Sequence, residues 1–147
     1  MFRFARPVLA ALLGLSAMLA AGPSVRAADL AAAVYTSDSG VCSENWMLNR
    51  ITSRFAYQVR HVPNLPQVAI NDFQDIYQTR YLPAREDRPI ARIYCGAKVA
   101  LSDGYSRDVW YLVEYGQGYA GIGNNVEFCV SGFDRWFVYN GRCRVLR

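Results

Sequence analysis

The residues with catalytic potential are few, and they do not form a familiar catalytic pattern. His61 is the single histidine, and no nucleophile or further metal ligand adjoins it in the sequence. Ser–His–Asp, Cys–His and most zinc hydrolase mechanisms need a histidine beside such a group, so we expect none of them here. His61 instead suits the C-terminal end of a helix, where it interacts favourably with the helix dipole.

Residues 116–121 (Gly-Gln-Gly-Tyr-Ala-Gly) match the G-x-G-x-x-G pattern of dinucleotide-binding folds. In those folds the glycines let a pyrophosphate approach a helix N-terminus. Here Gly123, Asn124 and Asn125 follow in place of a helix, and no parallel βαβ pattern surrounds the motif. The sequence therefore predicts a glycine-rich bend between strands and no cofactor.

Three carboxylates lie in or beside the predicted sheet: Glu114, Glu127 and Asp134. Two carboxylates about 5 to 10 Å apart can hydrolyse a glycoside. Ordinary ion pairing is the alternative, with partners such as Arg107, Arg135 and Arg144. Because no sequence spacing identifies a glycosidase pair, a small carboxylate-dependent hydrolase is only the third of our functional hypotheses.

Arginine and aromatic residues are unusually prominent. After residue 27 the chain has 12 arginines against one lysine, and 18 aromatic residues. Both types are enriched where proteins contact their partners. The candidate binding residues are Trp110, Tyr119, Trp136, Arg107 and Arg135. The alternative stays open that the rings fill the core while the arginines pair with acids at its rim.

The four cysteines, Cys42, Cys95, Cys129 and Cys143, predict two disulfides, as is usual for an even count in a short exported domain. We favour Cys42–Cys95 with Cys129–Cys143, and the main rival is Cys42–Cys143 with Cys95–Cys129. Zinc sites use closely spaced ligand pairs, whereas these cysteines are scattered, so we expect no metal site.

The first 27 residues have the layout of a secretory signal peptide. Arg3 and Arg6 precede an apolar run of 14 residues at 8–21, and Ala27 ends a small-residue cleavage site. The run is shorter than the roughly 20 residues that span a bilayer. We therefore expect cleavage near Ala27, a flexible lead-in at 28–41, one disulfide-stabilised domain at 42–147, and a periplasmic or secreted protein without a membrane span.

The net charge of the chain is lower without the predicted signal peptide than with it. The 147 residues carry a formal net charge of +4, but three of the 16 basic residues lie in the first 27. The other 120 residues hold 13 basic against 12 acidic side chains, a net charge of +1. A nucleic-acid-binding protein needs a strongly basic face, so we expect no nucleic-acid partner.

The element order predicts an α+β domain. Apolar residues at helical spacing mark a helix over 42–61 that Ser39 or Ser43 would cap and Pro63 would end. Residues 67–81 are ambiguous and could form a second, shorter helix beginning at Asn71 or Asp72.

Strand patterns follow at 90–101, 107–115 and 126–130. The first two flank an Asp-Gly hairpin turn, and a second hairpin is expected at 136–146 around Asn140-Gly141. One or two helices would thus pack on a curved antiparallel sheet of four to five strands, in a loosely cystatin-like arrangement.

Several segments of the chain resemble a group of small exported proteins of alphaproteobacteria that have no assigned activity. They are residues 88–92 (Arg-Pro-Ile-Ala-Arg), 101–104 (Leu-Ser-Asp-Gly), 109–114 (Val-Trp-Tyr-Leu-Val-Glu), 126–130 (Val-Glu-Phe-Cys-Val) and 132–136 (Gly-Phe-Asp-Arg-Trp). The resemblance covers most of the chain from about Cys42 onward. It implies export and a shared cysteine framework, but no substrate and no catalytic residue.

Together these observations favour a non-enzymatic, exported domain that binds an envelope glycan or protein through its surface. The second hypothesis is an inhibitor or accessory subunit of an envelope enzyme, with the loop at 116–125 entering a cleft. The sequence does not predict the oligomeric state.

Overall fold

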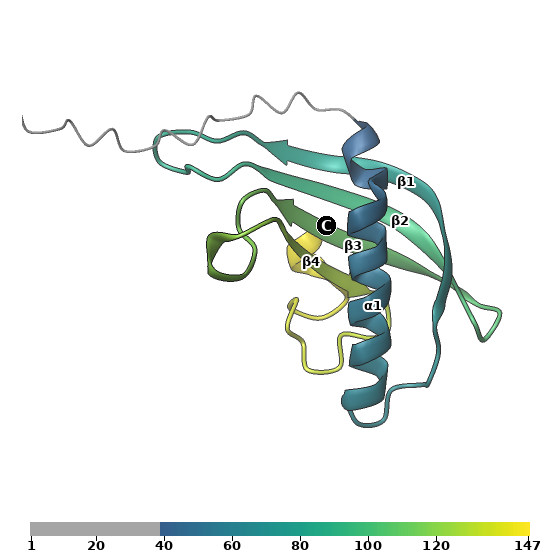
Figure 1. The fold of residues 1–147 in the computed structure, drawn as a ribbon. Helices are drawn as coiled ribbons and strands as arrows, with labels where there is room; N and C mark the ends of the chain where they lie inside the picture. Colours follow the sequence, from purple (N-terminus) through teal and green to yellow (C-terminus); the bar gives the residue numbers. More distant parts are fainter. Residues whose placement is uncertain (1–38) are drawn as a thin grey trace, which may run out of the picture. The chain divides into compact units, whose positions relative to one another are not determined.

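The computed structural model describes residues 39–147. The predicted signal at 1–27 and most of the predicted lead-in at 28–41 lie outside these residues. One helix packs on a four-stranded antiparallel sheet, which makes the domain α+β (Figure 1). The elements are η1 (Ser39–Ser43), α1 (Asn45–His61), β1 (Ile70–Leu82), β2 (Arg92–Leu101), β3 (Ser106–Glu114), η2 (Tyr119–Gly121), β4 (Asn125–Val130) and η3 (Arg144–Leu146).

Helix α1 forms where the sequence predicts it, because apolar residues recur every four positions on one face. The buried residues of that face are Met47, Ile51, Phe55 and Val59. The helix ends at His61, two residues before Pro63, whose ring disfavours helical geometry in the residue that precedes it.

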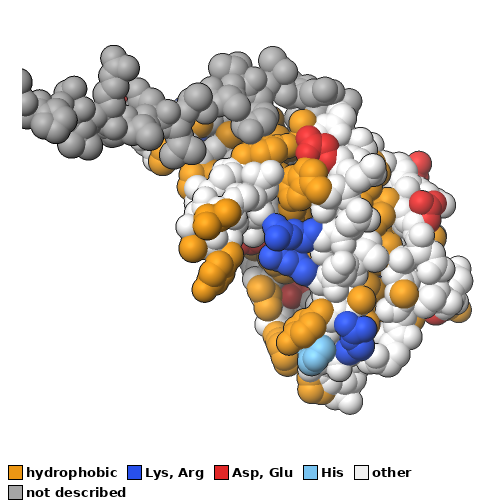
Figure 2. Space-filling model, viewed as in Figure 1, with side chains coloured by type: hydrophobic (Ala, Val, Ile, Leu, Met, Phe, Trp, Pro, Cys, Tyr) orange, Lys and Arg blue, Asp and Glu red, His pale blue; other side chains and the backbone are white. Residues whose placement is uncertain are grey.

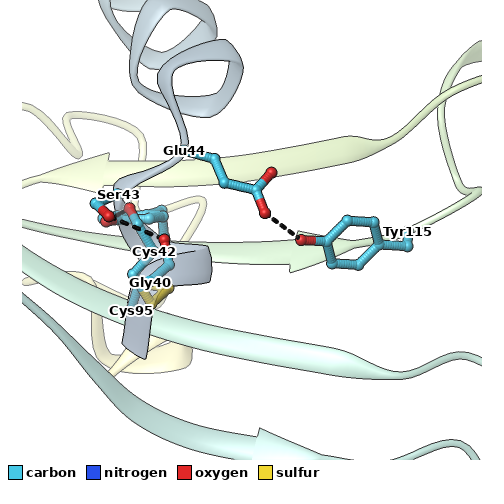
Figure 3. The surroundings of a disulfide bond; sticks show 7 residues. Gly40, Cys42, Ser43, Glu44, Cys95 and Tyr115 are labelled. Atoms are coloured by element: carbon cyan, nitrogen blue, oxygen red, sulfur yellow. Dashed lines mark hydrogen bonds between the residues drawn. A yellow bond between two sulfur atoms is a disulfide. The ribbon is translucent and has the colours of Figure 1, made fainter. Parts of the chain in front are cut away.

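The predicted serine cap of α1 is wrong. The N-cap residue is Glu44, whose side chain makes no capping hydrogen bond. Its carboxylate instead accepts hydrogen bonds from the Trp46 indole and from the Tyr115 hydroxyl, the latter at 3.3 Å (Figure 3). Ser43 belongs to η1, where its hydroxyl donates a 2.9 Å hydrogen bond to the Gly40 carbonyl. Glu44 thus joins the start of the helix to the residue that follows β3.

The predicted second helix is also wrong, because the segment forms the 13-residue strand β1. Its pairing with β2 contains three register shifts. Each irregularity alters which side of the sheet the following side chains face. Phe73, Ile76 and Tyr81 therefore all pack against the helix-side core, although their spacing does not alternate as in a regular strand. Pairing with β2 decided the outcome, and local spacing alone was misleading.

The sheet is a meander with the order β1-β2-β3-β4. The predicted hairpin between β2 and β3 is confirmed, and Gly104 adopts the positive φ of 84° that the Asp-Gly turn requires. The predicted second hairpin at 136–146 is wrong. Residues 131–147 form turns and η3, and positive φ angles interrupt any strand at Phe137, Asn140, Gly141, Arg142 and Cys143.

The two faces of the sheet have different covers. On β3, Val109, Tyr111 and Val113 belong to the core shared with α1. The neighbouring Leu112 and Trp110 belong to a second, smaller cluster with Tyr94, Cys129, Cys143 and Leu146. The C-terminal segment therefore covers part of the face opposite the helix, which explains why both sides of β3 carry apolar residues.

Two disulfides fix these covers to the sheet. Cys42–Cys95 joins η1 to β2, with the two Cα atoms 5.8 Å apart (Figure 3). Cys129–Cys143 joins β4 to the C-terminal segment, with a Cα separation of 5.5 Å. This is the pairing that the sequence analysis favoured. The second bond holds in place a segment that has little regular secondary structure.

Candidate functional site

A groove of about 270 Å³ lies between α1 and the segment that includes the end of β4 and the turns after it. Arg54 and Gln58 of α1 form one wall, while Phe128, Asp134 and Tyr139 contribute to the other. Figure 2 shows basic side chains on the flank of α1, with hydrophobic side chains of the neighbouring loops beside them. The groove therefore combines apolar and charged walls, as small-ligand sites commonly do.

Long-range hydrogen bonds hold the two walls together. Arg54 donates through Nη1 to the Val126 carbonyl oxygen at 2.6 Å, and Gln58 donates through Nε2 to the Phe133 carbonyl oxygen at 3.0 Å. Below them, the rings of Phe55 and Phe133 pack edge to face with their centroids 4.8 Å apart. The groove is thus built into the packing of the helix against β4 and the turn that follows.

Asp134 has an unusual position in this groove. Its Oδ1 atom accepts a long hydrogen bond of 3.4 Å from the backbone N–H of Tyr139. Its Oδ2 atom is buried and has no hydrogen-bond partner among the described residues. A buried polar atom without a partner costs stability, so Oδ2 retains an unused acceptor, which a ligand reaches once the side chain turns toward the groove.

Tyr139 provides a second polar group. Burial raises the pKa of its hydroxyl, and the negative charges of Glu127 and Asp134 raise it further. The positive charge of Arg54 and a hydrogen bond from the Phe128 backbone N–H act in the opposite direction. With its pKa above the ordinary value of about 10, the hydroxyl is protonated at neutral pH. It is then able to donate as well as accept a hydrogen bond.

Two of the five predicted binding residues lie together at this groove. Arg135 and Trp136 both line it, and 64% of the Trp136 side chain remains exposed. An exposed indole beside an unpartnered carboxylate oxygen provides a flat apolar surface next to a hydrogen-bond acceptor.

The other three predicted binding residues lie elsewhere. Trp110 is half-buried in the cluster opposite the helix, where the guanidinium of Arg147 lies 4.5 Å from its ring centroid. Arg107 lies near the β2–β3 hairpin turn, 5.3 Å from the Tyr105 ring centroid. Tyr119 projects from η2 and is 96% exposed. The five residues therefore do not form one continuous face.

Of the two glutamates that were predicted to lie in the sheet, Glu114 has a well-defined partner. Arg92 donates through Nε to Glu114 Oε1 at 2.8 Å, and this hydrogen bond raises the pKa of Arg92. Arg92 lies on the adjacent strand β2. It is not one of the three arginines, Arg107, Arg135 and Arg144, that were suggested from the sequence as partners. Neither Glu114 nor Glu127 lines the groove.

His61 lies at the C-terminal end of α1, as predicted. Its Nδ1 atom is 2.7 Å from the Tyr57 carbonyl oxygen, and its ring stacks on that of Tyr57 with the centroids 3.8 Å apart. Within residues 39–147, no group of three or more His, Cys, Asp or Glu side chains is placed to hold a metal ion.

Sequence reasoning missed the helix wall of the groove. Arg54 and Gln58 lie on the polar side of an amphipathic helix, where such residues are expected simply to face solvent. Their backbone partners are 72 and 75 residues away along the chain. Only the fold brings them together, and no local pattern signals the contact.

Comparison of the chain with protein-family models, curated proteins and solved structures finds no significant match. Among the described helices, none has the length and apolar character needed to cross a bilayer. We therefore infer its function from the geometry of this chain.

Proposed function

We propose that this chain is an exported protein whose groove binds a glycan of the cell envelope, and that it acts by binding rather than catalysis. The observation that carries the proposal is the exposed ring of Trp136 in a groove that Asp134 also lines, where the Oδ2 atom of Asp134 has no hydrogen-bond partner among the described residues. Sugars present hydroxyl donors on their edges and apolar C–H groups on their faces. A carboxylate acceptor beside an indole ring complements both features.

The remaining polar groups of the groove extend the same chemistry. Tyr139 is able to donate or accept, whereas Arg54 and Arg135 offer only donors. Envelope glycans often carry carboxylates or phosphates, and the planar arginine fork matches both groups. We expect the bound glycan to be acidic for this reason.

Export is supported by the predicted signal peptide together with the two disulfides, which persist in oxidising compartments. N-terminal sequencing of the protein purified from periplasm or medium should find a chain that begins near Ala28. Nonreducing peptide mapping of the same material should find no free thiol. An intact N-terminus starting at Met1 on cytoplasmic protein with alkylatable cysteines would overturn the proposal of export.

Glycan binding is tested by cosedimentation of the purified mature protein with insoluble cell-wall glycan. Asp134→Asn and Trp136→Ala should each lower the bound fraction about tenfold, because each removes a principal contact. Tyr105→Ala is the matched control, since Tyr105 is an exposed aromatic residue at the β2–β3 hairpin. Equal binding by the wild type and both groove variants would refute this assignment.

A second candidate function is inhibition of an envelope enzyme through the loop at 116–125. Tyr119 and Ile122 are 96% and 80% exposed at its tip, which favours insertion into a partner's cleft. The loop is held by a 2.9 Å hydrogen bond from the Gly118 N–H to the Gly123 carbonyl, and by Arg50, which donates to the Asn124 carbonyl at 2.6 Å. A loop ordered in advance loses little conformational entropy on binding.

The two candidates respond to different variants. Tyr119→Ala with Ile122→Ala should abolish capture of a partner enzyme while leaving glycan cosedimentation unchanged. The Asp134 and Trp136 variants should have the opposite effect. Loss of enzyme capture in the groove variants alone would count against the loop as the contact.

A further inference from the structure

The C-terminal segment exposes large hydrophobic side chains to a degree that glycan binding in the groove does not require. Trp136, Phe137 and Val138 are consecutive residues with exposed fractions of 64%, 71% and 68%, and Val145 is 55% exposed. Single exposed apolar residues are ordinary, whereas a run of neighbours marks a contact surface. Trp136 and Val138 also line the groove, whereas Phe137 and Val145 do not, so this surface extends beyond it.

The backbone holds these side chains in place. Phe137 has a φ of 56°, in the left-handed region that bulky residues rarely adopt. Its N–H donates to the Asp134 carbonyl at 3.2 Å, and its own carbonyl accepts from the Asn140 N–H at 2.9 Å. A Cβ atom at Gly141 would lie 3.1 Å from Phe137 Cδ1, so the ring lies close to that glycine's backbone. The exposure of Phe137 is therefore a property of a structured turn.

A basic concavity adjoins this turn. Arg142, Arg144 and Arg147 line a hollow of about 460 Å³ together with Phe137 and Asn140. The hollow has no acidic residue among its lining residues, and none of its three arginines forms an ion pair within residues 39–147. Arg144 donates through Nε to the Asn140 carbonyl oxygen at 2.9 Å, which leaves its terminal nitrogens available to an anion.

We propose that this C-terminal patch, defined as Trp136, Phe137, Val138 and Val145 with Arg142, Arg144 and Arg147, docks on an anionic phospholipid bilayer. Peripheral membrane proteins insert aromatic and aliphatic side chains at the headgroup level while arginines bind lipid phosphates. Charge complementarity selects this occupant. A purely apolar protein partner would desolvate three guanidinium groups that have no anionic partner among the described residues, although that of Arg147 stacks on the Trp110 ring. Lipid phosphates would pair with them.

Vesicle cosedimentation tests the proposal directly. The mature protein should bind vesicles of phosphatidylcholine with about 30% phosphatidylglycerol, and bind pure phosphatidylcholine vesicles about tenfold more weakly. Raising the salt concentration from about 0.1 M to 0.5 M should weaken binding to the anionic vesicles several-fold, because salt screens exposed charges. Trp136 fluorescence should shift to shorter wavelength on binding, and Trp136→Phe should remove that shift.

Two double variants separate the apolar and the basic contributions. Phe137→Ser with Val145→Ser, and Arg142→Ala with Arg144→Ala, should each reduce binding to anionic vesicles about tenfold. The matched controls are Tyr105→Ser and Arg107→Ala, because this pair of an exposed tyrosine and a partly exposed arginine lies at the β2–β3 hairpin, and they should bind as the wild type does. Circular dichroism and nonreducing peptide mapping check that every variant keeps its fold and disulfides.

Several results would overturn membrane docking. They are absence of vesicle binding by the folded wild type, equal binding to neutral and anionic vesicles, and equal losses in the hairpin controls. Capture of a purified protein that depends on the patch, without vesicle binding, would assign the patch to a protein partner instead. The patch shares Trp136 and Val138 with the proposed glycan groove, but Phe137 and Val145 do not line that groove, so the Phe137 and Val145 variant should still cosediment with cell-wall glycan.

Discussion

The buried hydroxyl of Tyr111 donates a 2.6 Å hydrogen bond to the carbonyl oxygen of Cys42, 69 residues earlier in the chain. Tyr111 is also the register partner of Cys95, the residue to which Cys42 is disulfide-bonded. A strand pair, a disulfide and a side-chain hydrogen bond thus connect the same three residues. All three are fully buried, so the start of the described chain is fastened to the middle of the sheet.

Tyr111→Phe should lower the free energy of unfolding by about 1 to 3 kcal/mol, because it deletes a buried hydrogen bond without changing the packing of the ring. Urea denaturation followed by tryptophan fluorescence measures the change. Tyr105→Phe is the control, since Tyr105 is 63% exposed, and it should unfold as the wild type does. An unchanged midpoint for Tyr111→Phe would show that the hydrogen bond adds no net stability.

The two disulfides should differ in what they stabilise. They span 53 and 14 residues, and the chain-entropy account assigns them about 4 and 3 kcal/mol respectively. The Cys129→Ala, Cys143→Ala variant should in addition raise hydrogen exchange around η3, because this is the only disulfide that cross-links the C-terminal segment to β4. The Cys42→Ala, Cys95→Ala variant should leave exchange in η3 unchanged under native conditions. Similar exchange in both variants would contradict this division.

Stability should fall at alkaline pH. Burial raises the pKa of Tyr111, and burial with two nearby carboxylates raises that of Tyr139. The unfolded chain then loses these protons at a lower pH than the folded one, near the ordinary tyrosine pKa of about 10. The stability that the two protonated tyrosines contribute is fully present below about pH 10. It is lost as the pH rises toward their pKa values in the folded protein.

The measurement is urea unfolding between about pH 8 and 11.5, a range that brackets the ordinary tyrosine pKa. Tyr111→Phe and Tyr139→Phe should each make the loss of stability above about pH 10 less steep. A variant curve parallel to that of the wild type would show that the replaced tyrosine does not contribute to the pH dependence.

Arginines of α1 should protect the edge of the sheet. Strand β4 is an edge strand of the sheet. Arg54 donates a hydrogen bond to the Val126 carbonyl oxygen in this strand, and Arg50 donates one to the carbonyl oxygen of Asn124, the residue just before the strand. Exposed strand edges are templates for association between chains. Arg50→Met with Arg54→Met should therefore cost about 1 kcal/mol or more in stability and promote self-association in light scattering. Arg60→Met in the last turn of α1 is the control and should remain as stable and dispersed as the wild type.

Elements with a local cause could be predicted from the sequence. The helical spacing of Ile51, Phe55 and Val59 specifies α1, and the Asp103-Gly104 turn specifies the β2–β3 hairpin. Residues 136–146 show the limit of such signals. Asn140-Gly141 is a strong hairpin dipeptide, yet the disulfide from Cys143 to Cys129 and packing on the sheet hold the segment in turns.

The amino-acid order by itself determined the helix and the central hairpin, because these depend on neighbours a few residues apart. The order of the elements predicted the α+β class, and the even cysteine count in a short exported domain predicted two disulfides. Tertiary structure alone decided that residues 70–82 form an edge strand, since its irregular pairing with β2 hides the usual alternation. It also created the groove, because Arg54 and Asp134 both line it although they lie far apart in the sequence. Such contacts follow from chain topology and packing, which no short window of sequence contains.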